Sequence, residues 1–309
     1  MLANFLNKSK PINFIGLLVF FFLVYVITVS SNFFLPGFSA DKLIKSTFLL
    51  ILFFSVFFMY NFIVAKNKLT HDNSYAYYLF TLLIITFLSE ILDYKTLILM
   101  FIYLLFVRKI YSLRSSKKVL EKLFDSSFWL GVLFLLESNF LVLFLLIYIA
   151  AYLHNKITIQ TLLVPVLGFM TPIFLYFTYL FWFDKIESFS NLFIFNINFD
   201  VQFYLKSSHF WLLLMLLVLI IFSIFSKSIK TLRINNTFKK SWILVIFNFL
   251  ILILFILIFP AKNNSEIIFI LFPISIILAN GIELIQKKLI KNLVLYFLLL
   301  GAIFYHFFL

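Results

Sequence analysis

The sequence predicts an all-α, polytopic integral membrane protein, and three observations support this fold class. Hydrophobic residues make up 64% of the 309 positions and charged residues only 12%, which is more apolar surface than one soluble core could bury. Long apolar runs recur from Ile12 to Phe307, and the gaps between them are too short for a separate globular domain. Basic residues cluster in those gaps. We therefore expect a single transmembrane domain over residues 1–309.

Apolar windows of roughly 17 to 25 residues mark helices that can cross about 30 Å of hydrocarbon. The clear windows are 12–30, 43–64, 74–91, 159–183, 210–226, 241–259, 267–285 and 292–307. The first resembles a signal peptide, but it lacks a small-x-small cleavage site and another span follows at once, so we expect a membrane helix. Residues 96–107 are also expected to form a segment, although they are short for a span.

Residues 128–153 are long for one span, and Glu137, Ser138 and Asn139 interrupt them midway. We expect a short broken helix pair whose turn lies at these polar residues. Each arm would have about 10 to 14 residues, or roughly 15 to 21 Å of helix, which is short for a full crossing. The preceding stretch 112–127 has the pattern of an amphipathic helix on the cytoplasmic surface. The chain then has about 11 membrane segments.

The distribution of charge favours the broken pair over one tilted helix. With the pair, six of the 25 Lys and Arg residues fall on one side, which leaves 25 − 6 = 19 on the other: the six are Lys42, Lys45, Lys95, Lys185, Lys206 and Lys262. Cytoplasmic loops accumulate basic residues, so we predict a bacterial inner-membrane protein with its N-terminus in and its C-terminus out. The net charge of +13 matches loops that face anionic lipid headgroups, and it requires no nucleic acid.

Several reaction types lack their residues in this sequence. There are no cysteines, which removes disulfides, thiolate metal sites and a cysteine nucleophile. The four histidines, which form no HxxxH or HExxH pair, are His71, His154, His209 and His306. The six glycines form no phosphate loop, nucleophile elbow or GxxxG motif. We expect no metal and no cofactor.

The remaining candidates for catalysis are carboxylates on the predicted outer side: Asp41, Glu90, Asp93 and Glu137. An ionised carboxylate inside the membrane costs several kcal/mol unless it is paired or solvated. Glu137 would therefore need a cavity or a cation, and the alternative is a turn that reaches the headgroups. At the end of the 267–285 segment, Glu283 and Lys287 are spaced for an i,i+4 ion pair.

Lys262, Asn263 and Asn264 form a candidate site for a lipid phosphate. They lie in the short loop that precedes the 267–285 segment, and Lys262 is the only basic residue there. An ammonium group beside a helix N-terminus can hold a phosphate with the help of free backbone N–H groups. The alternative is an ordinary solvated turn.

Two stretches resemble parts of the GT-C membrane glycosyltransferases. KNNSEIIFILFPISIILANGIE is similar to their late helix, and FWLGVLFLLESNFLVLFLLIYIAAYLHNK resembles their broken helix pair, with Gly131 in the place of the recurrent glycine. The resemblance implies a polyprenyl-linked sugar donor, phosphate contact by Lys262 and cavity lining by Glu137. The family's acidic pair in the first outer loop is reduced here to Asp41.

Over nearly its whole length the chain resembles an uncharacterised family of polytopic inner-membrane proteins from Flavobacterium-like Bacteroidota. The matching pieces are NKSKPINF, KNKLTHDNSYAY, RKIYSL with EKLFDSSFW, FDK, and KNNSE before FPISIILANGIE. That family has no established activity, so the resemblance bears on fold and location.

Three functions follow as hypotheses. The first is binding of a lipid-linked envelope precursor at the outer leaflet, or transfer from it, with membrane lipids and a polyprenyl-linked glycan as ligands. The second is a non-catalytic scaffold that assembles with other envelope proteins. The third is a transporter, which would show inverted repeats; the broken pair occurs once, without a counterpart in the other half.

Overall fold

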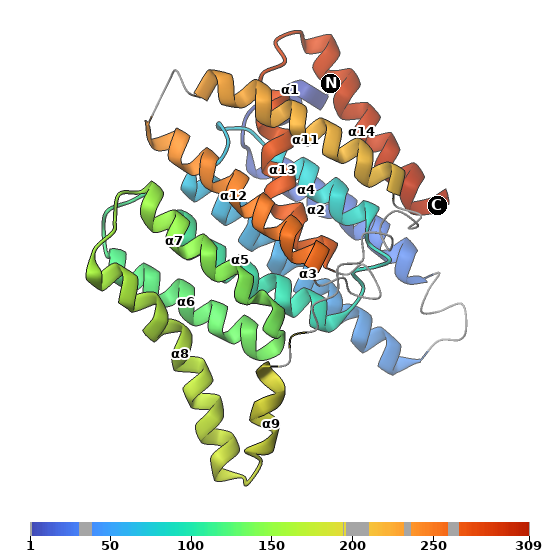
Figure 1. The fold of residues 1–309 in the computed structure, drawn as a ribbon. Coiled ribbons are helices and arrows are strands. Elements are labelled where there is room, and N and C mark those ends of the chain that lie inside the picture. Colours follow the sequence, from blue (N-terminus) through green and yellow to red (C-terminus); the bar gives the residue numbers. More distant parts are fainter. Residues whose placement is uncertain are drawn as a thin grey trace. The chain divides into compact units, whose positions relative to one another are not determined.

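The computed structural model describes residues 2–30, 39–193, 195, 210–231, 236–258 and 266–308, and this part of the chain contains helices and turns but no strand. The chain divides into two compact units (Figure 1). Unit 1 comprises residues 1–98, 204–234 and 262–309, and unit 2 comprises residues 99–203 and 235–261. Each unit therefore combines segments that are far apart in the sequence.

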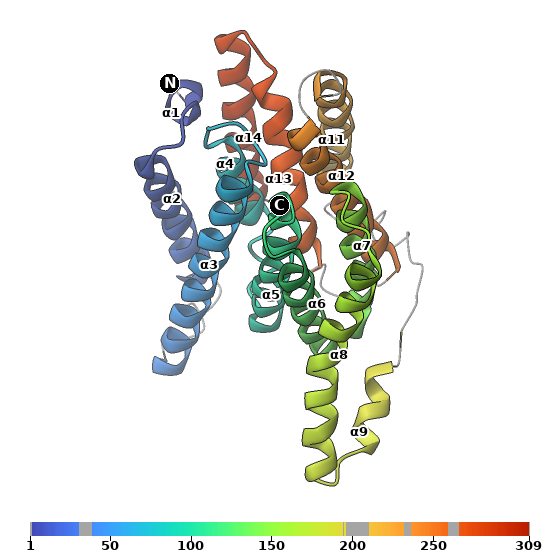
Figure 2. The same cartoon turned by 90° about the vertical axis from the view of Figure 1, so that its left-hand side faces the viewer.

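Unit 1 is built around two short helices, α4 and α13. Its helices are α1 (Leu2–Leu6), α2 (Pro11–Val29), α3 (Ala40–Asn67), α4 (Tyr75–Thr86), α11 (Phe210–Thr231), α13 (Ile267–Glu283) and α14 (Lys288–Phe308). Every residue of α4 is buried, as are most residues of α13, as expected for helices that are apolar all round. The two pack against each other; α14, α2 and α3 also contact α4, and α11 contacts α13 (Figure 2).

Hydroxyl groups fix this core. The hydroxyl of Tyr60 on α3 donates to the carbonyl of Ala76 on α4 at 3.2 Å and lies 2.7 Å from the hydroxyl of Ser275 on α13. The Tyr60 ring stacks on Phe80 of α4, with 3.9 Å between the ring centroids. These contacts set the register of three helices that are otherwise almost wholly apolar.

Unit 2 contains the remaining helices. These are α5 (Tyr94–Ser112, of which unit 2 holds the part from Leu99), α6 (Val119–Leu136), η2 (Ser138–Leu143), α7 (Phe144–Leu153), α8 (Ile159–Trp182), α9 (Glu187–Ser190), η3 (Asn191–Phe193) and α12 (Asn236–Ile258). The amide of Asn248 on α12 bonds the hydroxyl groups of Tyr103 and Tyr111 on α5. This buried set joins the first and last helices of the unit.

Close approach of α6 and α8 rests on two glycines. A Cβ added to Gly131 would lie 2.5 Å from the Phe169 carbonyl oxygen, and one added to Gly168 would lie 2.1 Å from the hydroxyl of Ser127. Neither position can hold a side chain without separating the helices. Small residues at such contacts let helix backbones approach closely in membranes.

Six helices in the described part of the chain are long and apolar enough to cross a membrane: α2, α3, α8, α11, α12 and α14. The sequence predicted about 11 segments, and each predicted segment does contain a helix. Helix α4, the 138–153 segment and α13 are apolar but shorter. The structure is therefore that of a helical, membrane-compatible protein, while the count of 11 and the topology stay predictions.

The broken pair at 128–153 has its break where the sequence placed it, but its first arm is longer than expected. Helix α6 ends at Leu136, and Glu137 is extended, with φ −153° and ψ 104°. The surface helix expected over 112–127 is not separate: residues 113–118 form the turn between α5 and α6, and residues 119–127 are the first part of α6. Its 18 residues span roughly 27 Å. The charged residues Glu121, Lys122 and Asp125 interrupt the apolar pattern without interrupting the helix.

Candidate functional site

The predicted phosphate site at Lys262, Asn263 and Asn264 lies outside the described residues. Its role therefore stays a prediction. The neighbouring Glu266 is described, and its side chain is buried in unit 1.

The four candidate carboxylates have separate local environments. Asp41 is exposed in the first turn of α3. Asp93 caps α5, because its Oδ2 accepts hydrogen bonds from the Thr96 amide and hydroxyl, both at 3.0 Å. Glu90 accepts from the Ser89 hydroxyl at 3.0 Å. These three residues belong to unit 1 and Glu137 to unit 2.

Glu137 follows the last residue of α6 and accepts a hydrogen bond from the Asn139 amide at 3.1 Å. Within the described ranges, no three or more His, Asp and Glu side chains gather closely enough to hold a metal ion. A catalytic role for these four carboxylates stays a prediction.

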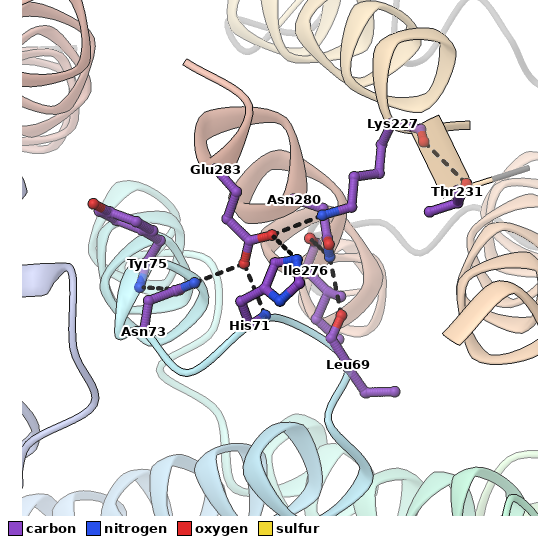
Figure 3. Close-up of polar contacts among 9 residues, drawn as sticks. All are labelled: Leu69, His71, Asn73, Tyr75, Lys227, Thr231, Ile276, Asn280 and Glu283. Carbon is purple, nitrogen blue, oxygen red and sulfur yellow. Dashed lines mark hydrogen bonds and ion pairs between the residues drawn. The ribbon is translucent and has the colours of Figure 1, made fainter. Parts of the chain in front are cut away.

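A cluster of charged and amide side chains in unit 1 surrounds Glu283, the last residue of α13 (Figure 3). Its Oε2 accepts from the Lys227 ammonium group at 2.7 Å, and the two side chains are only 6% and 4% exposed. Its Oε1 accepts from the His71 backbone amide at 3.0 Å and from the Asn73 side-chain amide at 2.7 Å. The carboxylate thus joins α11, α13 and the loop between α3 and α4.

Asn280 extends this cluster by one turn of α13. Its side-chain amide donates to the Leu69 carbonyl at 3.0 Å and to the Ile276 carbonyl at 2.9 Å, and the residue is fully buried (Figure 3). The bond to Leu69 holds the same α3–α4 loop that Glu283 holds through His71. The cluster is therefore a three-way joint rather than an open site.

Gly281 brings the two helices of the ion pair together. A Cβ at this position would lie 2.3 Å from the hydroxyl oxygen of Ser223 and 2.8 Å from its Cβ. Ser223 lies one helical turn before Lys227 on α11, so this contact sets the distance that the lysine must cover. The ANG sequence before Glu283 is thus explained by helix packing.

The expected ion pair between Glu283 and Lys287 is wrong. Helix α13 ends at Glu283, so Lys287 does not lie one turn further along the same helix, and Glu283 bonds Lys227 instead. The charge distribution places Lys227 among the 19 basic residues on the predicted cytoplasmic side. One signal could have found it: a lysine that directly follows a long apolar run on the same helix can lie against a neighbouring helix.

Unit 2 contains a different arrangement, which we call the basic cluster: His154, Lys156, Lys240, Arg114 and Lys122. His154 follows α7 and is 9% exposed, and its Nε2 has no hydrogen-bond partner among the described residues. Burial, followed by the positive charges of Lys240, Lys156, Arg114 and Lys122, lowers the pKa of His154 to about 4. The imidazole is therefore neutral at pH 7.

Hydrogen bonds hold two of the lysines of the basic cluster. Lys156 donates from Nζ to the Ser116 hydroxyl at 3.0 Å, and Lys122 donates to the Ser115 hydroxyl at 2.6 Å and to the Ser112 carbonyl at 2.7 Å. These bonds draw the α5–α6 loop and the α7–α8 loop together. The cluster gathers positive charge on three separate segments of the unit.

Comparisons with known proteins give a family but no described activity. No curated protein and no solved structure matches the chain significantly. A family model described as a family of unknown function (DUF6427) matches residues 1–309, which agrees with the resemblance to an uncharacterised family. Because the match covers both units, the whole chain belongs to the DUF6427 family.

Proposed function

We propose that this protein is a multi-spanning bacterial inner-membrane protein that binds a phosphate-bearing lipid at the basic cluster of unit 2. The observation that carries the proposal is the buried His154, whose Nε2 lacks a partner among the described residues while four cationic side chains act on it. A phosphate would neutralise part of this charge and accept hydrogen bonds from the lysines and the arginine. Basic residues beside membrane helices are the usual partners of anionic headgroups.

The topology with the N-terminus in and the C-terminus out is part of this proposal, and contacts within unit 1 support it. Four segments predicted to be cytoplasmic meet there. The Ser74 amide donates to the Leu6 carbonyl at 2.9 Å, and the Ala3 amide donates to the Asn292 side chain at 2.8 Å. Glu283 also bonds His71 and Lys227, and Lys227 adds the fourth segment of the same predicted side.

Contacts within unit 2 support the same arrangement. Lys109 forms an ion pair with Asp125, and Lys156 bonds Ser116. All of these residues, and Lys240, fall in loops predicted to be cytoplasmic. Loop residues that bond one another lie on the same side of the membrane, so these contacts support the charge-based assignment.

A polyprenyl-linked glycan is the more specific ligand that we propose, because the resemblance to GT-C enzymes implies such a donor. The sequence placed that ligand at the outer leaflet, on Lys262, whereas the basic cluster faces the cytoplasmic leaflet in the proposed topology. Both placements involve recognition of a phosphate, but one uses Lys262 and the other the lysines of the basic cluster. Substituting each set of lysines in one experiment therefore distinguishes the two sites.

The test is mass spectrometry of the lipids retained by purified protein. The variants are the pair Lys156→Ala with Lys240→Ala, the single change Lys262→Ala, and a control pair, Lys42→Ala with Lys45→Ala, on the predicted outer side. Loss of charge-assisted bonds of roughly 1.5 to 3 kcal/mol each predicts at least about a tenfold drop in retained phosphate-bearing lipid for the first pair. The control pair should retain the wild-type amount.

Loss of that lipid in Lys262→Ala alone would place the site at the outer loop and make the basic-cluster assignment wrong. If the wild type and every variant retained only the same amount of bulk phospholipid, the proposal that the protein recognises a specific lipid would be wrong. The scaffold hypothesis would then be tested by isolating protein partners from gently solubilised membranes.

A further inference from the structure

Unit 1 has a groove of its own, lined by α2, α3 and the start of α4. Its volume is about 540 Å³. The walls are apolar, and they include Phe14, Ile15 and Leu18 of α2 and Phe58 of α3. The polar lining consists of Ser9, Lys10, Asn61, Ser74 and Tyr77.

Tyr77 indicates that the groove holds a ligand. The residue is 4% exposed, and its hydroxyl group is buried without a hydrogen-bond partner in the described part of the chain. Leaving a buried hydroxyl unsatisfied costs on the order of a lost hydrogen bond, so native structures rarely do it. Tyr77 lines the groove, and an acceptor bound there would satisfy its hydroxyl group after a shift of the side chains that enclose the oxygen.

The mouth of the groove is held in place. The side-chain amide of Asn13, which is fully buried, donates to the Phe5 and Lys8 carbonyls, both at 2.8 Å, and to the Ser74 hydroxyl at 3.2 Å. These bonds fix the chain on either side of Lys10 against the start of α4. The polar end of the groove is therefore preformed.

Lys10 makes this end suitable for an anion. It is exposed and occupies the N-cap position of α2, where no side-chain cap is formed and Pro11 opens the helix. At this uncapped N-terminus Pro11 has no N–H and the Asn13 backbone amide donates to the Lys10 carbonyl, so the 19-residue helix contributes mainly the positive end of its dipole, and Lys10 adds its ammonium charge. A phosphate beside Lys10 would receive both.

We infer that this groove binds one anionic phospholipid. From Lys10 to Leu18 the lining extends along α2 by roughly 12 Å. Along this path the lining residues change from polar to apolar, as a phospholipid does from its headgroup to its acyl chains. The cation and hydroxyl groups lie at the mouth, Tyr77 lies further in against the Phe14 ring at 4.7 Å between centroids, and aliphatic and aromatic side chains follow. The phosphate would lie at Lys10, an ester carbonyl would accept from Tyr77, and an acyl chain would cover Ile15 and Leu18.

The test measures binding of palmitoyl-oleoyl phosphatidylglycerol to the full chain by native mass spectrometry, with phosphatidylcholine as the uncharged comparison. Tyr77→Phe removes only the hydroxyl group, so the melting temperature should stay unchanged while affinity falls about three- to tenfold. Lys10→Ala should abolish the preference for phosphatidylglycerol. Lys8→Ala is the matched control, because Lys8 is an exposed neighbour that does not line the groove.

Unchanged affinity in both Tyr77→Phe and Lys10→Ala would overturn the inference. So would a dimer of the chain that Tyr77→Phe dissociates, since a second copy would then occupy the groove. The Lys156→Ala, Lys240→Ala pair in the same assay separates the two proposals. If phosphatidylglycerol is lost in that pair but kept in Tyr77→Phe, the basic cluster is the lipid site and the groove is not; the opposite pattern reverses the conclusion.

Discussion

At the scale of single residues, the Lys227–Glu283 pair has the largest energetic consequence. Both side chains are nearly withdrawn from water, so each carries a desolvation cost that the partner must offset. Glu283 is well supported because two further donors, the His71 amide and the Asn73 side chain, reach its other oxygen. A carboxylate with three donors serves to hold the α3–α4 loop against α11 and α13.

Removing only the cation should therefore be costly. We expect Lys227→Met to lower the free energy of unfolding by about 3 to 5 kcal/mol, because it leaves a buried charge without its counter-ion. The double variant Lys227→Met with Glu283→Gln should recover most of that loss, since Gln can still accept from His71. Thermal unfolding in detergent measures both, and a Lys227→Met variant as stable as the wild type would show that the pair is solvated.

At the scale of helices, glycine positions decide how closely the elements pack. Gly281 lies against Ser223 in unit 1, and Gly131 and Gly168 lie between α6 and α8 in unit 2. The absence of a GxxxG motif concealed these contacts. The spacing Ser127-x-x-x-Gly131 is a small-xxx-small pattern and could have revealed the one in unit 2.

Gly281→Ala tests the packing of α11 on α13. The added methyl group would overlap the Ser223 side chain and lengthen the Lys227–Glu283 bond, so we expect a loss of roughly 1 to 3 kcal/mol. Gly301→Ala is the matched control, because a Cβ there meets no atom within 4 Å. Equal unfolding temperatures for the two variants would contradict the close contact.

The positions of the helices followed from hydropathy, but their ends and partners did not. Each apolar window became a helix because a backbone in hydrocarbon must bond internally. Val119 to Asp125 was missed as part of α6 because hydropathy windows exclude charged turns that a helix tolerates. Lys227 was missed because its partner, Glu283, is 56 positions away, and no local pattern encodes that pairing.

At the scale of the whole molecule, the account depends on the chain crossing the membrane repeatedly with its basic loops on one side. Composition was enough to predict a helical membrane protein, since so apolar a chain has few other folds open to it. The two compact units could not be predicted, because unit 1 collects residues from three separate stretches of sequence and unit 2 from two. The predicted topology puts the lipid sites proposed on Lys10 and on the basic cluster at the same leaflet.

The most direct test of this claim is single-cysteine accessibility, for which a chain without native cysteines needs no prior changes. Asp72→Cys, Lys117→Cys, Ser89→Cys and Glu187→Cys probe exposed positions on both predicted sides of both units. In intact spheroplasts, a membrane-impermeant maleimide should label Ser89→Cys and Glu187→Cys at once, and the other two only after lysis. Labelling of Lys117→Cys from outside, or protection of Glu187→Cys until lysis, would contradict the predicted topology and the cytoplasmic placement of the basic cluster.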